Sequence, residues 1–369
     1  MPGQDDGTAI DFEIDRRDWH KVRFRDSASP VATSPGQVLL RVDRFALTSN
    51  NVSYALTGDM LGYWNFFLAE AGFGRVPVMG FADVVESRHP DVKPGERFFG
   101  FYPMSTHLLV EAADATRSQF VDVAAHRRDT ALAYRQYLRS SADPQYEEQR
   151  EDAILLLRGL FLTSFLVDDF LAENREFGAT RFFVSSASSK TAIALAACLS
   201  RRKAGRVVGL TSERNRAFVS GLGCYDEVLP YEAIEAVDPT TPSVFVDHSG
   251  DGRVVNGLHR RLGENLRHSA AVGATHWNGE RPARNLPGPS PTFFFAPSQL
   301  EKRRAEWGPE GFEARLGESW RSFLAFSDGW LRIVRGRGRA DLERVWGDLV
   351  DGRVRPEEGH VLSLQDRNG

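Results

Sequence analysis

The residues best suited to chemistry form a short run of small hydroxylated side chains. Residues 185–190 are Ser-Ser-Ala-Ser-Ser-Lys, and they stand between an apolar run, 181–184, and an Ala- and Leu-rich stretch, 191–200. Hydroxyl groups hydrogen-bond phosphate oxygens, and the free N–H groups and dipole of a helix N-terminus favour the same anion. This pattern predicts a phosphate-binding turn between a strand and a helix. Its predicted cofactor contacts are Ser185, Ser186, Ser188, Ser189 and Lys190.

The turn differs from the dinucleotide-binding fingerprint. That fingerprint, G-x-G-x-x-G, uses glycines so that the backbone can approach the pyrophosphate, and residues 185–190 contain none. The letters A-S-S-K-T resemble a Walker loop, but that motif also needs two glycines. The alternative role of the serines is to cap the helix that begins near Lys190. Phosphate contact and capping are compatible, and both remain open.

The end of the next apolar run bears on the choice between NAD and NADP. An acidic residue there binds the ribose 2′-hydroxyl of NAD and repels the additional phosphate of NADP. This chain has Thr211 and Ser212 instead, followed by Arg214 and Arg216. The pattern favours NADP(H), with all four residues as cofactor contacts. Glu213 argues against it, and the alternative is a solvated helix start capped by Ser212.

Two later strands are each followed by polar residues. D-H-S-G at 247–250 follows a predicted strand at 243–247, and G-A-T-H at 273–276 follows one at 269–272. Ligands of open α/β sheets bind outside the carboxyl ends of the strands. We therefore expect a catalytic role for His248, and the alternative is a loop histidine bonded to the backbone. The further predicted cofactor contacts are Ser249, Gly250, Gly273, Thr275 and His276.

An aromatic segment near residue 60 predicts the substrate side of a pocket. Residues 62–67 are Gly-Tyr-Trp-Asn-Phe-Phe, and Asn50 and Tyr54 precede them. Rings of this kind suit a small hydrophobic or planar substrate. A phenol with a pKa of about 10 can act as a general acid when it is oriented, so Asn50, Tyr54 and Tyr63 are the candidate catalytic residues here. The alternative is that the run, Trp64 included, belongs to the core.

Two kinds of structure must position these residues. Short strands separated by Gly and Pro over 11–125 predict a barrel-like sheet, and alternating strands and helices to about residue 278 predict a Rossmann-like parallel sheet. Helical patterns cover 130–138 and 147–173. We expect residues 1–150 and 290–369 to form the barrel-like unit, ending in two or three helices. Residues 151–289 then form the nucleotide-binding unit.

Composition excludes several classes of protein. The 369 residues are 41% hydrophobic and 26% charged, as in ordinary globular proteins, and the net charge of −4 provides no basic field for nucleic acid or membrane. Two cysteines, Cys198 and Cys224, exclude a disulfide scaffold and a multi-cysteine zinc site. The N-terminus does not resemble a signal peptide. We expect a cytoplasmic, bacterial protein that acts on a small molecule, with a homodimer as one possible assembly.

The order of several short strings resembles the medium-chain dehydrogenase/reductase superfamily, in particular its zinc-free, quinone-reductase-like branch. The strings are P-G-Q-V-L-L-R-V at 35–42, S-N-N-V-S-Y-A-L-T-G at 49–58, V-K-P-G-E-R-F-F-G at 92–100, L-T-S-F-L at 162–166 and L-G-C-Y-D-E-V-L-P-Y at 222–231. The resemblance implies a Rossmann domain inserted into a GroES-like barrel.

A narrower resemblance is to the DUF2855 family of that superfamily. It is carried by M-G-F-A-D-V-V-E-S-R-H-P at 79–90, G-F-Y-P-M-S at 100–105 and S-S-A-S-S-K-T-A at 185–192. Zinc-dependent relatives carry G-H-E where this chain has Gly80-Phe81-Ala82, so we expect no metal. The residues favour a zinc-free NADP(H)-dependent reductase of an activated C=C or C=O bond. The alternative is a non-redox lyase, isomerase or small-ligand binding protein that has lost the dinucleotide.

Overall fold

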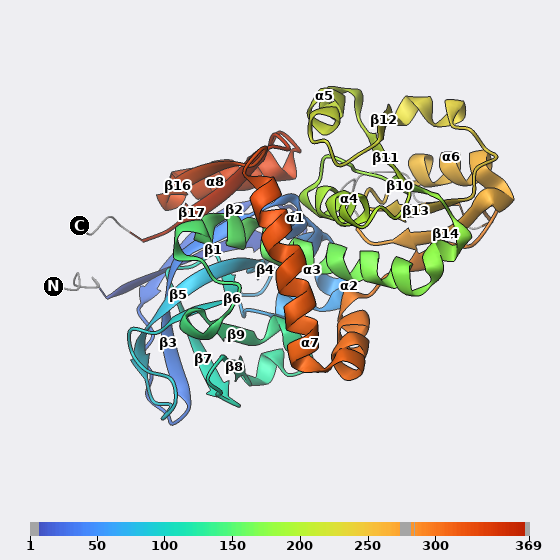
Figure 1. Ribbon diagram of the computed structural model, residues 1–369. Helices are drawn as coiled ribbons and strands as arrows, with labels where there is room; N and C mark the ends of the chain where they lie inside the picture. Colours follow the sequence, from blue (N-terminus) through green and yellow to red (C-terminus); the bar gives the residue numbers. More distant parts are fainter. Residues whose placement is uncertain (1–6, 274–281, 284, 366–369) are drawn as a thin grey trace. The chain divides into compact units, whose positions relative to one another are not determined.

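The computed structural model describes residues 7–273, 282–283 and 285–365. It divides into two compact units (Figure 1). Unit 1 contains residues 1–156 and 332–369, and unit 2 contains residues 157–331. We call them the barrel unit and the parallel-sheet unit, after the sheets described below.

Six antiparallel strands close the barrel. They are β3 (Gln37–Leu47), β5 (Pro77–Ser87), β6 (Arg97–Pro103), β7 (His107–Ala113), β8 (Gln119–Asp122) and β9 (Gln136–Arg139). The ring closes because β3 pairs with both β5 and β7. Two glycines face each other across β5 and β6, Gly80 and Gly100, and a Cβ on either would lie 2.7 Å from a tyrosine ring. Glycine is therefore required where Tyr102 and Tyr137 pack into the barrel.

Both ends of the chain contribute to the barrel unit. Its remaining elements are β1 (Thr8–Asp15), β2 (Val22–Ala28), β4 (Phe73–Gly74), α1 (Ser49–Leu56), α2 (Gly58–Leu61), β16 (Arg332–Arg337), α8 (Gly338–Val350) and β17 (Glu358–Ser363). Strand β17 pairs antiparallel with β3, and β16 pairs parallel with β17. The chain thus returns to its first domain, as the resemblance implied.

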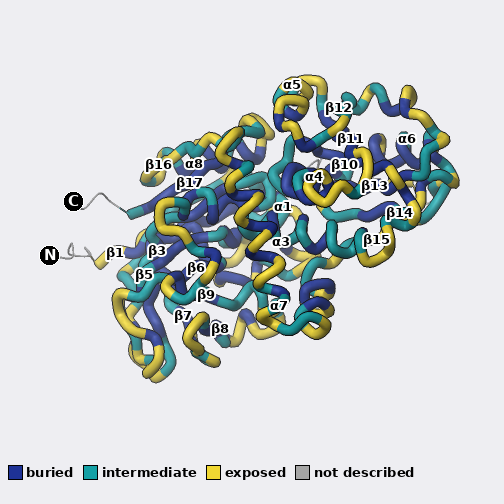
Figure 2. Tube along the Cα trace, in the orientation of Figure 1, coloured by how far each residue is buried: buried dark blue, intermediate teal, exposed yellow. Residues whose placement is uncertain are grey.

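In the described part of the parallel-sheet unit, six parallel strands follow the order β12-β11-β10-β13-β14-β15. They are β10 (Arg181–Val184), β11 (Arg206–Thr211), β12 (Glu227–Pro230), β13 (Ser243–Asp247), β14 (Leu266–Ala271) and β15 (Thr292–Phe293). Every residue of β10 and β13 is buried (Figure 2), which explains their apolar centres, F-F-V and V-F-V. The order reverses between β10 and β13, so the carboxyl ends of these strands form the switch point of a Rossmann sheet.

Helices complete this unit. They are α4 (Lys190–Arg202), α5 (Glu213–Gly221), α6 (Gly252–Leu262) and α7 (Ala296–Ser327), and α3 (Glu151–Glu173) enters from the barrel unit. Among the described residues, no helix has both the length and the apolarity of a membrane span. The predicted fold class, a Rossmann-like sheet inserted into a barrel-like domain, is confirmed.

Three local predictions differ from the structure. Residues 130–138, expected to be helical, form a short turn at Leu132–Tyr134 and strand β9. The reason is tertiary, because β9 pairs with β6 and β8. The C-terminal region contains strands β16 and β17 besides its helices. The expected boundary at 289/290 also differs, because α7 groups with unit 2, where Phe161 of α3 packs on its Trp320 and Phe323.

Candidate functional site

The turn from β10 to α4 adopts a glycine-like conformation without glycine. Ser186 has a φ of +49°, in the left-handed region that favours glycine. Ala187 follows, and a Cβ on Gly209 of the neighbouring strand would lie 3.0 Å from the Ala187 Cβ. The small side chains of the turn therefore permit the close helix–strand packing that glycines permit in the fingerprint. They leave the N-terminus of the 13-residue helix α4 at the switch point.

Two tyrosines that flank β12, Tyr225 before it and Tyr231 after it, hold this turn. The N–H of Ser186 donates to the Tyr231 hydroxyl over 3.1 Å, and the Tyr225 hydroxyl donates to the Ala187 carbonyl over 2.9 Å. Asn215 of α5 donates to the Ser188 hydroxyl oxygen over 3.0 Å. Sequence reasoning missed Tyr231, although it ends the string 222–231. The Tyr231 hydroxyl accepts the hydrogen bond of the Ser186 N–H, and this N–H is one of the backbone donors that a pyrophosphate would use.

Ser185 is committed to a buried carboxylate. Its hydroxyl donates to Asp247 Oδ1 over 2.5 Å, and its oxygen accepts the N–H groups of His248 and Ser249 over 2.9 and 3.1 Å. Burial raises the pKa of Asp247, and hydrogen bonds from Ser185, Ser249 and Gly250 oppose that rise. Because these three hydrogen bonds use both the proton and the oxygen of its hydroxyl, Ser185 connects the end of β10 to the end of β13. The predicted phosphate contact then falls on later residues of the turn.

Capping, the alternative role of the serines, is present at Ser189. Its side chain is the N-cap of α4 and accepts the Ala192 N–H over 3.3 Å. Ser188 and Lys190 are only partly buried, and the Ser188 hydroxyl proton is not needed for the bond from Asn215. The side chains of the turn best placed for a phosphate are therefore those of Ser188 and Lys190.

The polar residues after β11 lie where they were expected. Thr211 is buried at the strand end, and Ser212 is the N-cap residue of α5 without a side-chain capping bond. Arg214 and Arg216 are exposed on the first turns of α5, and Arg216 lies 3.6 Å from Glu213. The region therefore presents two guanidinium groups and one carboxylate to solvent.

His248 lies at the end of β13 but faces the interior. Its side chain is 2% exposed, and burial lowers its pKa to about 4, so the imidazole is neutral near pH 7. Gly250 follows in a turn with a φ of +68°, and a Cβ on Gly273 would lie 3.2 Å from the His248 carbonyl oxygen. Thr275 and His276 lie outside the described residues.

The barrel unit gathers the predicted phenols. The rings of Tyr54 and Tyr63 are 4.8 Å apart, and Tyr134 lies 6.0 Å from Tyr63, 5.0 Å from Phe66 and 5.3 Å from Phe101. Asn50 and Tyr54 lie one helical turn apart on α1, and Tyr63 begins the short helical turn Tyr63–Asn65. Burial is the main cause that raises the pKa of both Tyr54 and Tyr63. We call Tyr54, Tyr63 and Tyr134 the tyrosine cluster.

Tyr134 was missed because it lies in a segment that was interpreted as a plain helix. Trp64, in contrast, is core, as the alternative interpretation had it. Its indole is 3% exposed, and a Cβ on Gly58 or Gly74 would lie 2.3 or 2.2 Å from it. The aromatic run 62–67 thus divides into three core residues, Trp64, Phe66 and Phe67, and a partly buried phenol, Tyr63.

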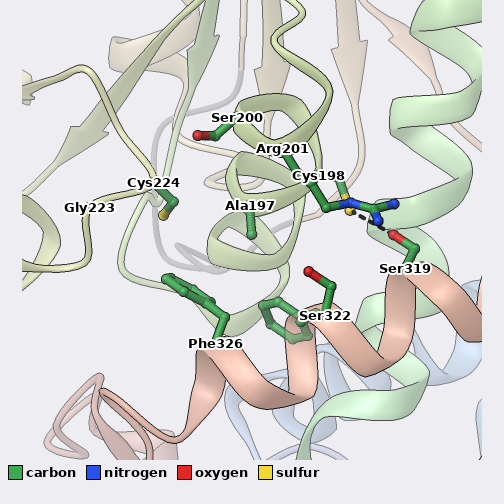
Figure 3. Close-up of a pocket in the computed structure, with 10 residues that line it drawn as sticks. Ala197, Cys198, Ser200, Arg201, Gly223, Cys224, Ser319, Ser322 and Phe326 are labelled. Atoms are coloured by element: carbon green, nitrogen blue, oxygen red, sulfur yellow. Dashed lines mark hydrogen bonds between the residues drawn. The ribbon is translucent and has the colours of Figure 1, made fainter.

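A separate cavity of about 210 Å³ lies in the parallel-sheet unit, at the C-terminal half of α4. Figure 3 shows Ser319 and Ser322 of α7 facing α4 across it, with Cys198 and Cys224 on its walls. Burial raises the pKa of each thiol to about 12. Both cysteines are therefore protonated near pH 7 and are poor nucleophiles.

We expect both thiols to react slowly with a disulfide reagent such as DTNB in the native protein. Each is at most 5% exposed, so labelling requires opening of the structure. In denaturant both should react at the rate of a free thiol. Rapid labelling of either thiol under native conditions would contradict this assignment, and mass spectrometry of the labelled peptides identifies which cysteine reacted.

Within residues 7–273, 282–283 and 285–365, no group of three or more His, Cys, Asp or Glu side chains is arranged for a metal ion. The segment that resembles G-H-E in zinc enzymes lies in β5, where the ring of Phe81 is covered by the Arg97 guanidinium at 5.1 Å. That metal is not required stays a prediction, and elemental analysis after dialysis is its measurement.

The model of the family described as protein of unknown function DUF2855 matches residues 45–355. The chain belongs to this family. The resemblance to DUF2855 drawn from the short strings is thereby confirmed. No curated protein matches the DUF2855 chain by sequence.

Several solved structures have the same fold, and two of the following three are oxidoreductases by name. CurA from Vibrio vulnificus, in complex with NADPH, has a TM-score of 0.57 at 13% identity, over 93% of this chain and 95% of that one. The yhdH oxidoreductase from Salmonella enterica, in complex with NADP, has a TM-score of 0.56 at 15% identity, over 97% and 100%. The quinone oxidoreductase from Coxiella burnetii has a TM-score of 0.54 at 13% identity, over 97% and 100%. At these identities the similarity establishes the fold.

Proposed function

We propose that this DUF2855 protein is an NADP(H)-dependent reductase that acts on an activated C=C or C=O bond of a small hydrophobic or planar substrate. The observation that carries the proposal is the switch point of the parallel sheet. There a turn in glycine-like conformation opens helix α4, beside a strand end followed by two exposed arginines. NADPH and NADP in two structures of the same fold support this choice of cofactor.

The residues fit a dinucleotide with one adjustment. Ser188, Lys190 and the N-terminal turn of α4 would hold the pyrophosphate. Arg214 and Arg216 would hold the 2′-phosphate, since guanidinium groups pair well with phosphate. The adjustment concerns Tyr231, whose hydroxyl takes the Ser186 N–H, so this amide is available only when that bond opens. When bound, the nicotinamide would supply a hydride.

The barrel unit would supply the proton. Reduction of an activated double bond leaves a carbanion or alkoxide, and a phenol held in an apolar surrounding stays protonated until such an acceptor arrives. The phenols of the tyrosine cluster fulfil this condition, because burial holds the pKa of Tyr54 and Tyr63 above the ordinary value. His248 does not suit this role, since its buried imidazole is neutral near pH 7 and lacks the acidic proton of an imidazolium. We assign it to the wall of the switch point.

The competing function is a non-redox enzyme or small-ligand binding protein. The specific observation in its favour is that Tyr231 and Asp247 occupy hydrogen-bonding groups of the turn. If these bonds do not open, the pyrophosphate has lost part of its site. Cofactor binding therefore separates the two functions.

We expect NADPH to bind more tightly than NADH to the purified protein. One arginine–phosphate pair contributes on the order of 1–2 kcal/mol, which is roughly five- to thirtyfold in affinity. Arg214→Ala or Arg216→Ala should lose that preference and leave NADH binding nearly unchanged, whereas Lys190→Ala should weaken both cofactors. Titration calorimetry measures all three.

The matched control is Arg206→Ala. Arg206 is also exposed and forms an ion pair, with Glu227 at 3.0 Å. It is the first residue of β11, however, and so lies at the amino ends of the parallel strands, away from the switch point. Its replacement should change neither affinity. If neither cofactor binds at millimolar concentration, the reductase function is wrong and the non-redox alternative replaces it.

A further inference from the structure

One side chain joins the turn after β10 to the helix after β11. The Asn215 side-chain amide donates to the Ser188 hydroxyl oxygen over 3.0 Å, although the two residues are 27 apart in the sequence. Asn215 stands in the first turn of α5, where its own N–H donates to the carbonyl of the N-cap residue, Ser212, over 3.0 Å. This hydrogen bond therefore connects the segment assigned to the pyrophosphate with the segment assigned to the 2′-phosphate.

The first turn of α5 divides its side chains between two directions. Arg214 and Arg216 are exposed, whereas Asn215 between them is half-buried. The helical period explains the difference, since consecutive residues of a helix point about 100° apart. The helix itself is held by other contacts, because Val219 is fully buried. Loss of the Asn215 amide therefore leaves the two arginines on their helix.

The bond has a defined direction, because the nitrogen of the Asn215 amide faces Ser188 and an NH₂ group can only donate. Ser188 therefore accepts through its oxygen, and its hydroxyl proton remains for another acceptor. In the parts of the chain that the structure describes, no protein group accepts that proton. Ser188 directly precedes Ser189, the N-cap of α4. The proton thus lies beside the N-terminus of a helix, where an anionic oxygen is the favoured acceptor.

We propose that Asn215 is a positioning residue of the cofactor site, whose amide orients the Ser188 hydroxyl so that its proton is presented to the pyrophosphate. This inference rests on the proposed reductase function. The gain is preorganisation: without the amide the hydroxyl rotates among its staggered positions, and the cofactor must order it on binding. One helical turn then has two tasks. Its inward amide serves NADPH and NADH alike, and its outward arginines serve only NADPH.

Titration calorimetry of the full chain with NADPH, NADH and ADP tests this role. Asn215→Ala should weaken all three ligands about five- to tenfold, because each carries a diphosphate that accepts from Ser188. The ratio of the NADPH and NADH affinities should change less than about twofold, in contrast to the lost preference expected for Arg214→Ala and Arg216→Ala. Asn215→Asp should weaken binding more strongly, since a carboxylate takes the Ser188 proton and repels the phosphates.

A double-mutant cycle separates positioning from general support of the fold. Ser188→Ala should weaken the three ligands about tenfold. Adding Asn215→Ala to Ser188→Ala should cost less than about a further twofold, because the hydroxyl that the amide orients is gone. A merely structural amide would cost the same in both backgrounds, and that result would overturn the inference.

Asn265→Ala is the matched control. Asn265 is also a half-buried asparagine of the parallel-sheet unit, and its side chain also donates one hydrogen bond, to the Pro239 carbonyl over 2.9 Å. It directly precedes β14, however, and so lies at the amino ends of the parallel strands. Its replacement should leave the affinities for NADPH, NADH and ADP unchanged. A loss equal to that of Asn215→Ala would show that any missing amide bond weakens the unit.

The outcomes separate this inference from the reductase function. Wild type that binds NADPH, with unchanged affinities in Asn215→Ala, would overturn the inference and leave the function standing. Binding of ADP but of neither NADPH nor NADH, with the expected losses, would remove the function and keep Asn215 as the positioning residue of a phosphate site. If wild type does not bind ADP either, both are wrong. Thermal unfolding shows which variants are folded at the temperature of the titration, and Asn215→Asp carries the test where Asn215→Ala is not.

Discussion

Arg97→Ala should destabilise the barrel unit by about 3–5 kcal/mol, the cost of leaving the buried carboxylate of Glu151 without its main counter-ion. Arg97 donates to Glu151 over 2.6 and 2.8 Å, to Asp83 over 2.8 Å and to Asp43 over 2.6 Å. The Glu151 side chain is 6% exposed and also accepts the Tyr146 hydroxyl. The guanidinium therefore joins strands β3, β5 and β6 to the first residue of α3.

The measurement is chemical denaturation, with hydrogen exchange to locate the loss. Because the two units can unfold separately, exchange should rise first in barrel peptides. Arg97→Lys should give an intermediate loss, since an ammonium cannot bond three carboxylates in a fixed plane. Arg332→Ala is the control: its pair with Glu358 is exposed on the arginine side, and its removal should cost under about 1 kcal/mol. Equal losses from Arg97→Ala and Arg332→Ala would contradict the role of this network.

Acid should destabilise the parallel-sheet unit through His248. Burial lowers the pKa of His248 to about 4 in the folded chain, against about 6.5 in an unfolded one. Between pH 4 and pH 6.5 the unfolded state binds more protons than the folded state. The contribution of His248 to the free energy of unfolding is therefore fully present above about pH 6.5 and is lost as the pH falls to about 4. The total loss from this residue is about 3 kcal/mol. Asp247 acts in the opposite direction, because burial raises its pKa.

The difference between wild type and His248→Gln isolates this contribution. Denaturation at several pH values between 7 and 4 should give a steeper loss of stability for wild type than for the variant. The readout is the slope, because the substitution also changes the stability at pH 7. His20→Gln, at an exposed histidine of the barrel unit, should leave the slope of the parallel-sheet unit unchanged. Parallel curves for wild type and His248→Gln would show that the imidazole titrates normally.

The sequence predicted the elements whose burial determines their composition. Strand β10 was predicted residue for residue, because a central parallel strand is apolar on both faces. Strands β16 and β17 were missed because charged residues and glycines interrupt the apolar pattern of their sequences, R-I-V-R-G-R and E-G-H-V-L-S. Candidate site residues could be proposed from the sequence where they follow strand ends, and their roles stay predictions. Contacts such as Ser186 with Tyr231, 45 residues apart, depend on tertiary packing and leave no local pattern.

The insertion of one unit into the other has a consequence for the order in which the chain matures during synthesis. Residues 157–331 form a continuous segment, whereas the barrel unit requires His360 of β17 to pair with Leu47 of β3. The parallel-sheet unit can therefore fold on the ribosome as soon as it has emerged, while residues 45–47 of β3 stay unpaired on one side until β17 has been made. An unpaired strand edge invites association with other chains. Nascent chains arrested before residue 358 should thus depend on chaperones more than the completed protein does.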